Sequence, residues 1–465
     1  MLLITHRPAG PIVPILLVTR DTWEAQRALL APAAAAFAQA SGFEPKAGRC
    51  CLLPDAQGAI ATVLFGLEPH GSPKADPFLP GKLATLLPEG DYEFASSTPG
   101  GDEAAELAAL AWCLSAYRFT RYKKPVGGQP RLICPAGVDA GRVKRIVEGV
   151  TLARDLVNTP PNDMGPHALE SAVRALAARH GASLSSIVGE DLLARNFPLI
   201  HAVGRAAAEP PRLVEFTFGP EDAPKVTLVG KGVCFDTGGL DIKPSSAMLL
   251  MKKDMAGAAT ALALAHMIMD AGLRLRLRVL IPIVENSVSA ASFRPGDVYP
   301  SRKGLNVEIG NTDAEGRLIL ADALALAAEE RPLLLFDFAT LTGAARVALG
   351  PDLPPFYTGD DALAAEIASA GARMNDPVWR LPLWEAYDSL LDSKVSDLNN
   401  VSSGPFAGSI TAALFLRRFV EGANSWVHFD IYGWVPGTKP GRPEGGETQT
   451  ARLLYALLEA RYPAA

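Results

Sequence analysis

Two short stretches of the chain carry charged residues whose types and spacing suit metal chemistry. Residues 229–257 place lysines and aspartates between an apolar, strand-like run and an alanine-rich helical run, and residues 311–317 read NTDAEGR. In both stretches the charges are interleaved with glycine or apolar residues, so we expect many of them where water is scarce. Because buried charge persists only when it is paired or bound to a metal, the sequence predicts that the two stretches meet around cations.

The carboxylates of these stretches offer oxygen ligands for divalent cations such as Mg²⁺, Mn²⁺ or Zn²⁺. The candidates are Asp236, Asp241, Asp254, Asp313 and Glu315. More than three converging carboxylates would repel one another unless two metal ions shared them. Histidines are too sparse and isolated for a histidine-rich zinc site, so the carboxylates must carry the metal.

The spacing of charges in the second stretch is that of an extended segment with one charged side. Asp313 and Glu315 are two residues apart, which in an extended segment would point both side chains to one side, and Arg317 continues the series. Asp254 precedes the helix expected at residues 256–271, where a carboxylate is favoured by the helix dipole.

The lysines of the first stretch admit two interpretations. Beside metal ions a lysine is either a neutral amine ligand, whose low pKa a bound cation enforces, or a charged group that faces the substrate. The alternative is that these lysines only form ion pairs with the aspartates. The GKG run at residues 230–232 lacks the spacer of a phosphate-binding loop, so a nucleotide site is not indicated.

The elements that must position these residues alternate between strand and helix from residue 165 onward. We expect strands at residues 213–218, 226–229, 275–284 and 333–338, and helices at 169–180, 256–271 and 318–329. This alternation predicts an α/β fold with a mostly parallel central sheet flanked by helices. Ligands bind at the carboxyl ends of such strands, and there the sequence places Lys231, Asp236 and residues 340–343.

The first 130 residues predict a smaller α/β unit without paired catalytic groups. Its strands are expected at residues 14–18, 59–65 and around Ile133, and its helices at 21–40 and 102–119. A linking helix at residues 138–157 ends before two prolines. We therefore predict an N-terminal scaffold or assembly domain at residues 1–150 and a catalytic domain at residues 151–465.

Composition restricts the function classes. A chain of 465 residues with 48% hydrophobic and 20% charged residues is typical of a soluble globular protein with a large core. Its net charge of −6 gives no reason to expect nucleic acid as a partner. The five scattered cysteines fit reduced thiols, and neither a signal peptide nor a membrane span is indicated, so we expect a cytoplasmic protein.

The heptapeptide NTDAEGR at residues 311–317 is the signature of the leucyl aminopeptidase family, the two-metal cytosol aminopeptidases, which this chain resembles. VGKG, FDTGG, IKP and MKKDMAGAA follow in that family's order and spacing, as do RDLVNTPPNDMGP at 154–166 and DFATLTGA at 337–344. The likeness is dense from residue 154 to about 430 and thin before residue 100.

The resemblance implies a site with two divalent metal ions, Mn or Zn. One ion would be held by Lys231 as a neutral amine, Asp236, Asp254 and Glu315, and the other by Asp236, Asp313 and Glu315. Two cations lower the pKa of a bridging water, so that hydroxide is available near neutral pH for attack on a peptide carbonyl.

The resemblance also implies roles for residues outside the metal shell. Lys243 would stay charged and stabilise the oxygen of the scissile carbonyl, and Arg317 would hold a bicarbonate ion that serves as general base. Asp241 is not a ligand in the family. Met251 and Thr340 would line the pocket for the first side chain, and Thr340 and Leu341 would supply backbone contacts to the substrate.

One departure from the family pattern concerns this pocket. After residues 428–431 the family usually continues with small residues, whereas this chain has the bulkier YGWVP at 432–436. The resemblance therefore does not extend to a preference for leucine. It implies peptide substrates, a homohexamer and no membrane partner.

Two other function classes remain alternatives to an aminopeptidase. A Mg²⁺-dependent phosphohydrolase would need similar carboxylates, and a non-catalytic assembly or DNA-binding protein would need none of them. The complete charged set, from Lys231 to Arg317, favours an enzyme, and no basic block supports DNA binding.

Overall fold

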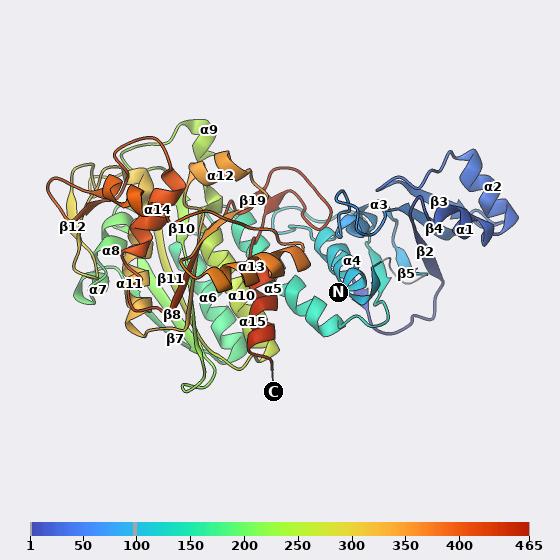
Figure 1. Cartoon of the computed structure of the whole chain (residues 1–465), viewed down its shortest axis with the longest axis horizontal. Coiled ribbons are helices and arrows are strands. Elements are labelled where there is room, and N and C mark those ends of the chain that lie inside the picture. The colour runs from blue at the N-terminus through green and yellow to red at the C-terminus, as the bar shows by residue number, and fades with distance from the viewer. Residues whose placement is uncertain (1, 96–99, 465) are drawn as a thin grey trace. The chain divides into compact units, whose positions relative to one another are not determined.

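The computed structural model describes residues 2–95 and 100–464, which fold as two compact units. The first unit contains the residues up to Val147 together with Gly437–Glu444, and the second contains Glu148–Pro436 together with the residues from Gly445 onward. Figure 1 traces the chain through both units. In the part of the chain that the structure describes, no helix combines the length and apolarity needed to cross a bilayer.

The first unit is built on a six-stranded sheet in the order β1-β6-β5-β2-β4-β3, which is parallel except for the β3–β4 pair. Its strands are β1 (Leu3–Ile4), β2 (Ile12–Val18), β3 (Cys50–Pro54), β4 (Ile60–Gly66), β5 (Gly90–Phe94) and β6 (Pro130–Ile133). Its helices are α1 (Trp23–Ala28), α2 (Pro32–Ala40), the 3₁₀ segment η1 (Leu79–Lys82), α3 (Leu83–Leu86) and α4 (Gly101–Ser115).

The single helix expected at residues 21–40 is wrong, because the segment forms α1 and α2 instead. Pro32 is the first residue of α2, and the preceding Ala31 has an extended ψ of 144°. A proline disfavours helical geometry in the residue before it, so the helix must break there. The helix expected at 102–119 also ends earlier, at Ser115.

The second unit has a nine-stranded sheet that is mostly parallel, as the sequence predicts. Its main path is β16-β15-β18-β14-β9-β11-β8-β7, and β10 pairs with β11. The strands are β7 (Ser183–Val188), β8 (Arg212–Phe218), β9 (Lys225–Gly230), β10 (Gly232–Asp236), β11 (Arg276–Asn286), β14 (Leu334–Ala339), β15 (Pro355–Tyr357), β16 (Trp379–Arg380) and β18 (Ser425–Asp430). The central strands β18, β14, β9 and β11 run parallel to one another.

Helices cover both faces of this sheet (Figure 1). On one face lie α7 (Asp191–Ala194), α8 (Pro198–Gly204), α11 (Glu315–Glu329) and α14 (Gly408–Arg417). On the other lie α6 (Pro166–His180), α10 (Ala256–Ala271), α13 (Asp361–Arg373) and α15 (Ala451–Arg461), and α5 (Ala140–Asn158) leads into this unit. The long apolar runs of α10 and α11 are buried almost throughout, which fits helices packed between a sheet and further helices.

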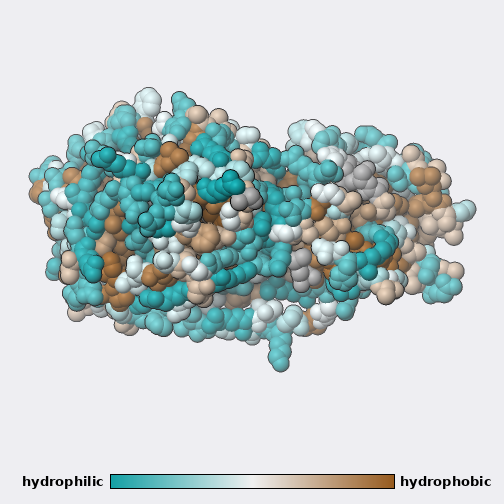
Figure 2. All heavy atoms as spheres, turned by 90° about the horizontal axis from the view of Figure 1, so that it is seen from below, coloured by the Kyte–Doolittle hydropathy of each residue, from teal (hydrophilic) through white to brown (hydrophobic). Residues whose placement is uncertain are grey.

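Short elements complete the second unit. They are α9 (Ser245–Met248), α12 (Gly343–Leu349), the 3₁₀ segments η2 (Met251–Met255), η3 (Thr312–Ala314) and η4 (Glu385–Leu391), and the strands β12 (Val298–Pro300), β13 (Asn306–Glu308), β17 (Leu398–Asn399), β19 (Trp434–Val435) and β20 (Gly445–Gly446). The face seen in Figure 2 is largely hydrophilic, with apolar residues in small groups, as expected when most apolar area is inside.

The carboxyl ends of the central strands meet at one edge of the sheet. Phe338 of β14 pairs with Gly230 of β9, and Ala339 pairs with Asp430 of β18. The residues that directly follow these strands, including Lys231 and Thr340, therefore lie side by side at that edge. This is where an open α/β sheet binds its ligands.

Candidate metal centre

Four carboxylates and a lysine converge at this edge of the sheet. Lys231 follows β9 and Asp236 is the last residue of β10, whereas Asp254 lies in η2 directly before α10. The second stretch supplies Asp313 from η3 and Glu315 as the first residue of α11. The structure thus brings together the two charged stretches of the sequence.

Each of two lysines lies between two of these carboxylates. Lys231 Nζ is 2.9 Å from an oxygen of Asp254 and 2.9 Å from Glu315 Oε1. Lys243 Nζ is 2.8 Å from Asp236 Oδ2 and also contacts Asp313. The Lys231 side chain is buried, whereas the side chain of Lys243 is 13% exposed and lines the adjoining cavity.

Three of the carboxylates are close enough to share a metal ion. One oxygen each from Asp236, Asp313 and Glu315 lie within 4.8 Å of one another, and Asp236 and Glu315 are buried. Among the described residues, Glu315 Oε2 has no hydrogen-bond partner although it is buried. A cation can supply the missing partner of this oxygen, and the oxygen-rich donor set fits a divalent metal.

The buried carboxylates of the centre repel one another. Burial, and then repulsion from Asp236, raises the pKa of Glu315 to about 8 and that of Asp313 to about 6. Burial alone would lower the pKa of the Lys231 amine, but Asp254 and Glu315 raise it instead. A divalent cation among these carboxylates would relieve the repulsion and favour their charged forms.

The extended conformation expected for residues 311–317 is wrong. The Asn311 side chain accepts a hydrogen bond of 2.7 Å from the Asp313 backbone N–H and so caps the η3 turn, and α11 begins two residues later. Asp241 holds this turn against the first stretch, because its Oδ2 accepts a hydrogen bond of 2.8 Å from the Thr312 N–H. Asp241 is therefore a structural contact between the two stretches.

Arg317 lies close to the carboxylates in sequence, but it is the third residue of the helix α11 and not part of an extended segment. It is 7% exposed, and its Nη1 donates a hydrogen bond of 2.6 Å to the Asn400 carbonyl oxygen. Burial lowers the pKa of Arg317 to about 10. Its Nε has no hydrogen-bond partner among the described residues, and the side chain lines the cavity beside the carboxylates.

Two glycines allow the close packing of this centre. A Cβ at Gly257 would lie 2.1 Å from the carbonyl oxygen of Phe338, so only glycine lets α10 approach β14 this closely. A Cβ at Gly316 would lie 2.5 Å from Cε and 2.6 Å from Nζ of Lys231. Both distances are far below normal contact distances, so each glycine is required by its neighbours.

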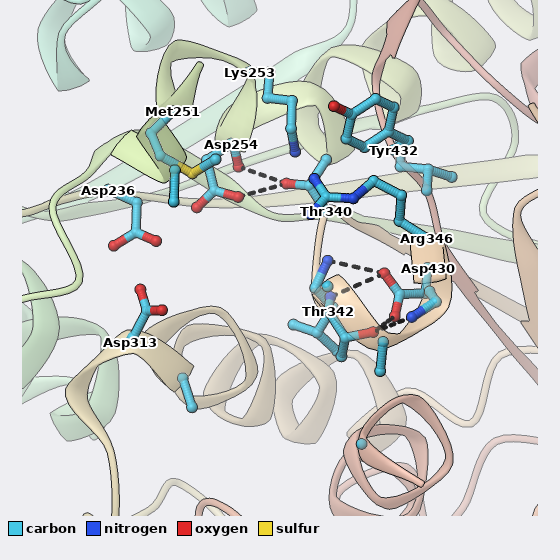
Figure 3. A pocket seen from close by; sticks show the side chains of 18 of the residues that line it. Asp236, Met251, Lys253, Asp254, Asp313, Thr340, Thr342, Arg346, Asp430 and Tyr432 are labelled. Atoms are coloured by element: carbon cyan, nitrogen blue, oxygen red, sulfur yellow. Dashed lines mark hydrogen bonds between the residues drawn. The ribbon is translucent and has the colours of Figure 1, made fainter. Parts of the chain in front are cut away.

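A cavity of about 710 Å³ opens beside the carboxylates, and Figure 3 shows part of its lining. Met251, Thr340 and Leu341, which the sequence predicts to contact substrate, all line it. Thr340 Oγ1 donates a hydrogen bond of 2.6 Å to Asp254, and the Leu341 N–H donates one of 3.0 Å to Asp430.

Sequence reasoning missed several residues of the site. Asn286, at the end of β11, donates a hydrogen bond of 2.8 Å to Asp236 Oδ1 and so orients this carboxylate. Asp430, at the end of β18, accepts from Thr342 and Ser409. Both residues end a strand at the ligand-binding edge, which is the signal that could have identified them. Lys253 and Arg346 also line the cavity.

The fold and the site together define a candidate metal centre built from carboxylates at the carboxyl edge of an α/β sheet. Comparison with known proteins gives the family. Residues 151–455 match the catalytic domain of the cytosol aminopeptidase family, and residues 13–135 match the N-terminal domain of M17 aminopeptidases. The chain belongs to this family of dinuclear metal hydrolases and is a metalloaminopeptidase.

Individual relatives agree with this assignment. The probable cytosol aminopeptidase of Syntrophotalea carbinolica is 44% identical over 78% of this chain and 77% of its own length. The crystal structure of the cytosol aminopeptidase from Coxiella burnetii, 44% identical, superposes with a TM-score of 0.94 over 99% of both chains. The bottromycin maturation enzyme BotP in complex with Mn, 33% identical, gives a TM-score of 0.87 over 97% of this chain and 99% of its own. Among the predicted classes, these findings favour the aminopeptidase over a phosphohydrolase or a non-catalytic protein.

Proposed function

We propose that this chain releases the N-terminal residue of peptides at a centre for two divalent metal ions, Mn or Zn. Lys231, as an amine that gives up its proton when the ion binds, would hold one ion together with Asp236, Asp254 and Glu315. Asp236, Asp313 and Glu315 would hold the other. The observation that carries the proposal is the convergence of three carboxylate oxygens within 4.8 Å of one another, with Glu315 Oε2 lacking a donor among the described residues. Mn in the BotP structure supports the choice of metal. Such ions supply Lewis-acid polarisation of a carbonyl and a lowered pKa of water.

In this proposal Lys243 acts as the electrophile that meets charge developing on the scissile carbonyl oxygen. Its ammonium lines the cavity, and although burial opposes the charged form, Asp236 and Glu315 raise the pKa of Lys243 above its usual range. A fixed positive charge in a site shielded from water stabilises an oxyanion more than it would in water.

Arg317 would hold a bicarbonate ion that serves as the general base. The buried guanidinium of Arg317 beside the cavity supports this role. Its Nη1 donates a hydrogen bond to the Asn400 carbonyl oxygen, and its Nε has no acceptor among the described residues. A planar anion with adjacent oxygens suits the fork of donors on a guanidinium. In that position bicarbonate would accept the proton that water loses during attack.

Met251, Thr340 and Leu341 would contact the first residue of the peptide. Restriction to that residue follows if its free α-amino group binds at the metal centre. We further propose that residues 151–465 form the catalytic domain and that residues 1–150 serve as a scaffold in a cytoplasmic homohexamer. Those last assignments follow the family resemblance.

Replacement of Glu315 tests the proposal directly. Glu315→Ala should abolish both hydrolysis of aminoacyl anilides and binding of Mn, because Glu315 would contact both ions. Glu329→Ala is the matched control, since Glu329 lies on the same helix but is 54% exposed and pairs with Arg302. Full activity in Glu315→Ala would overturn the metal assignment, and turnover of phosphate esters instead of anilides would overturn the peptidase function.

A further inference from the structure

A buried lysine beside the metal centre has no acidic partner among the described residues. Lys253, in η2, is 6% exposed, and its ammonium makes no ion pair or side-chain hydrogen bond with any described residue. It lines the cavity that also contains Lys231 and Asp254. Because a buried charge without a partner is costly, this position calls for an anion that the chain itself does not supply.

A second cation reaches the same place from another element. The ring of Tyr432 lies 4.9 Å from Lys253 Nζ and 5.3 Å from the Cζ of Arg346, measured to the ring centroid. Arg346 comes from α12 and also forms no ion pair with a described residue. In Figure 3 the two side chains converge beside Tyr432, so an ammonium and a guanidinium face one end of the cavity.

The two nearest carboxylates are engaged elsewhere. Asp254 contacts Lys231 and accepts a hydrogen bond from Thr340. Asp430 accepts hydrogen bonds from the backbone N–H groups of Leu341 and Thr342 and from the hydroxyls of Thr342 and Ser409. Neither carboxylate pairs with Lys253 or Arg346, so this end of the cavity presents unpaired positive charge.

These cations lie where the first side chain of a substrate would enter. Thr340 is one of the residues expected to line the pocket for the first side chain. Lys253, Arg346 and Tyr432 line the same cavity as Thr340 and Met251.

We propose that this pocket selects an acidic first residue, glutamate or aspartate, whose side-chain carboxylate binds Lys253 and Arg346 against the Tyr432 ring. The proposal rests on the aminopeptidase function above and names its substrate class. A leucine side chain would leave the ammonium without a partner, and a lysine side chain would be repelled by both cations. An acidic side chain supplies the missing anion and accepts charge-assisted hydrogen bonds.

Glutamyl and glutaminyl p-nitroanilides provide the sharpest test, because they have the same shape and differ in charge. With the Mn-loaded full chain, we expect kcat/KM for the glutamyl substrate to exceed that for the glutaminyl substrate by about tenfold or more, and the leucyl substrate to be slower than the glutamyl one. Equal rates for the first two, or a preference for leucine, would overturn the acidic preference and leave the peptidase function standing. Hydrolysis of none of the anilides would overturn both.

Two variants test whether Lys253 and Arg346 cause the preference for an acidic first residue. Arg346→Met and Lys253→Met should each lower the glutamyl-to-glutaminyl ratio of kcat/KM about tenfold, mainly by raising KM for the glutamyl substrate. Lys252→Met is the matched control, since Lys252 contacts the ring of Trp434 and the Asn158 carbonyl oxygen rather than the cavity. Metal content measured for each variant separates a change of specificity from a loss of Mn, and an unchanged ratio in both cavity variants would refute the assignment.

Discussion

The substitution Gly316→Ala should separate catalysis from stability. A methyl group on Gly316 would lie 2.5 Å from Cε and 2.6 Å from Nζ of Lys231, whereas carbon atoms in normal contact lie about 3.5–4.0 Å apart. Lys231 is buried, so its amine must move by roughly 1 Å relative to Glu315 and Asp254. A misplacement of that size can cost about 10²-fold in rate, or roughly 2.7 kcal/mol of barrier.

The same substitution should have two opposing effects on the stability of the fold, because the displaced Lys231 side chain is destabilising and alanine is the better helix former. Gly316 is the second residue of α11, and alanine is favoured over glycine inside helices by up to about 1 kcal/mol. We therefore expect kcat for an aminoacyl anilide to fall about 100-fold with only a small fall in Tm. Gly141→Ala is the matched control, because Gly141 is the second residue of α5 and a Cβ there would meet only an oxygen of Asp139, at 3.1 Å. Unchanged kcat in Gly316→Ala would refute the argument that Lys231 must occupy its observed position.

Three further predictions concern the metal and the fold. The pKa values of Glu315 and Asp313 are raised to about 8 and 6, so both carboxyls must lose protons when metal binds, and Mn affinity should rise from pH 6 to 8. Calorimetry in two buffers should detect the released protons. An affinity that does not change with pH would contradict this prediction. Asn286→Ala should weaken Mn binding about 10- to 100-fold, measured by the same titration, since Asn286 orients Asp236. Asp322→Ala should lower the free energy of unfolding by about 3 kcal/mol, because the buried Asp322 carboxylate accepts hydrogen bonds from three backbone N–H groups. Urea denaturation measures this change, and a change under about 0.5 kcal/mol would contradict the prediction.

Hydrophobic periodicity was sufficient to predict the long buried elements. The expected helix at residues 256–271 is α10 (Ala256–Ala271), and the strands expected at 213–218 and 226–229 lie within β8 and β9. In such elements the local pattern and the tertiary environment agree, because both faces of a central strand and most of a central helix are buried.

Short segments were harder to predict because distant contacts decide their conformation. The turn at Thr312–Ala314 depends on Asp241, about seventy residues earlier, and on the Asn311 cap, so a period-two pattern gave the wrong geometry. The sequence also did not reveal that Lys253 and Arg346 form no ion pair with a described residue. Lys253 precedes Asp254 in the chain, which suggests an ion pair between the two. Only the fold brings Lys253 and Arg346 to the same Tyr432 ring.

The central claim is that one centre at the sheet edge holds two metal ions. An anomalous-difference map from crystals of the Mn-loaded chain tests it most directly. The account predicts two Mn peaks, one in contact with Lys231 and Asp254 and the other with Asp313, with Asp236 and Glu315 contacting both. A single peak, or Mn bound away from these residues in active protein, would contradict it.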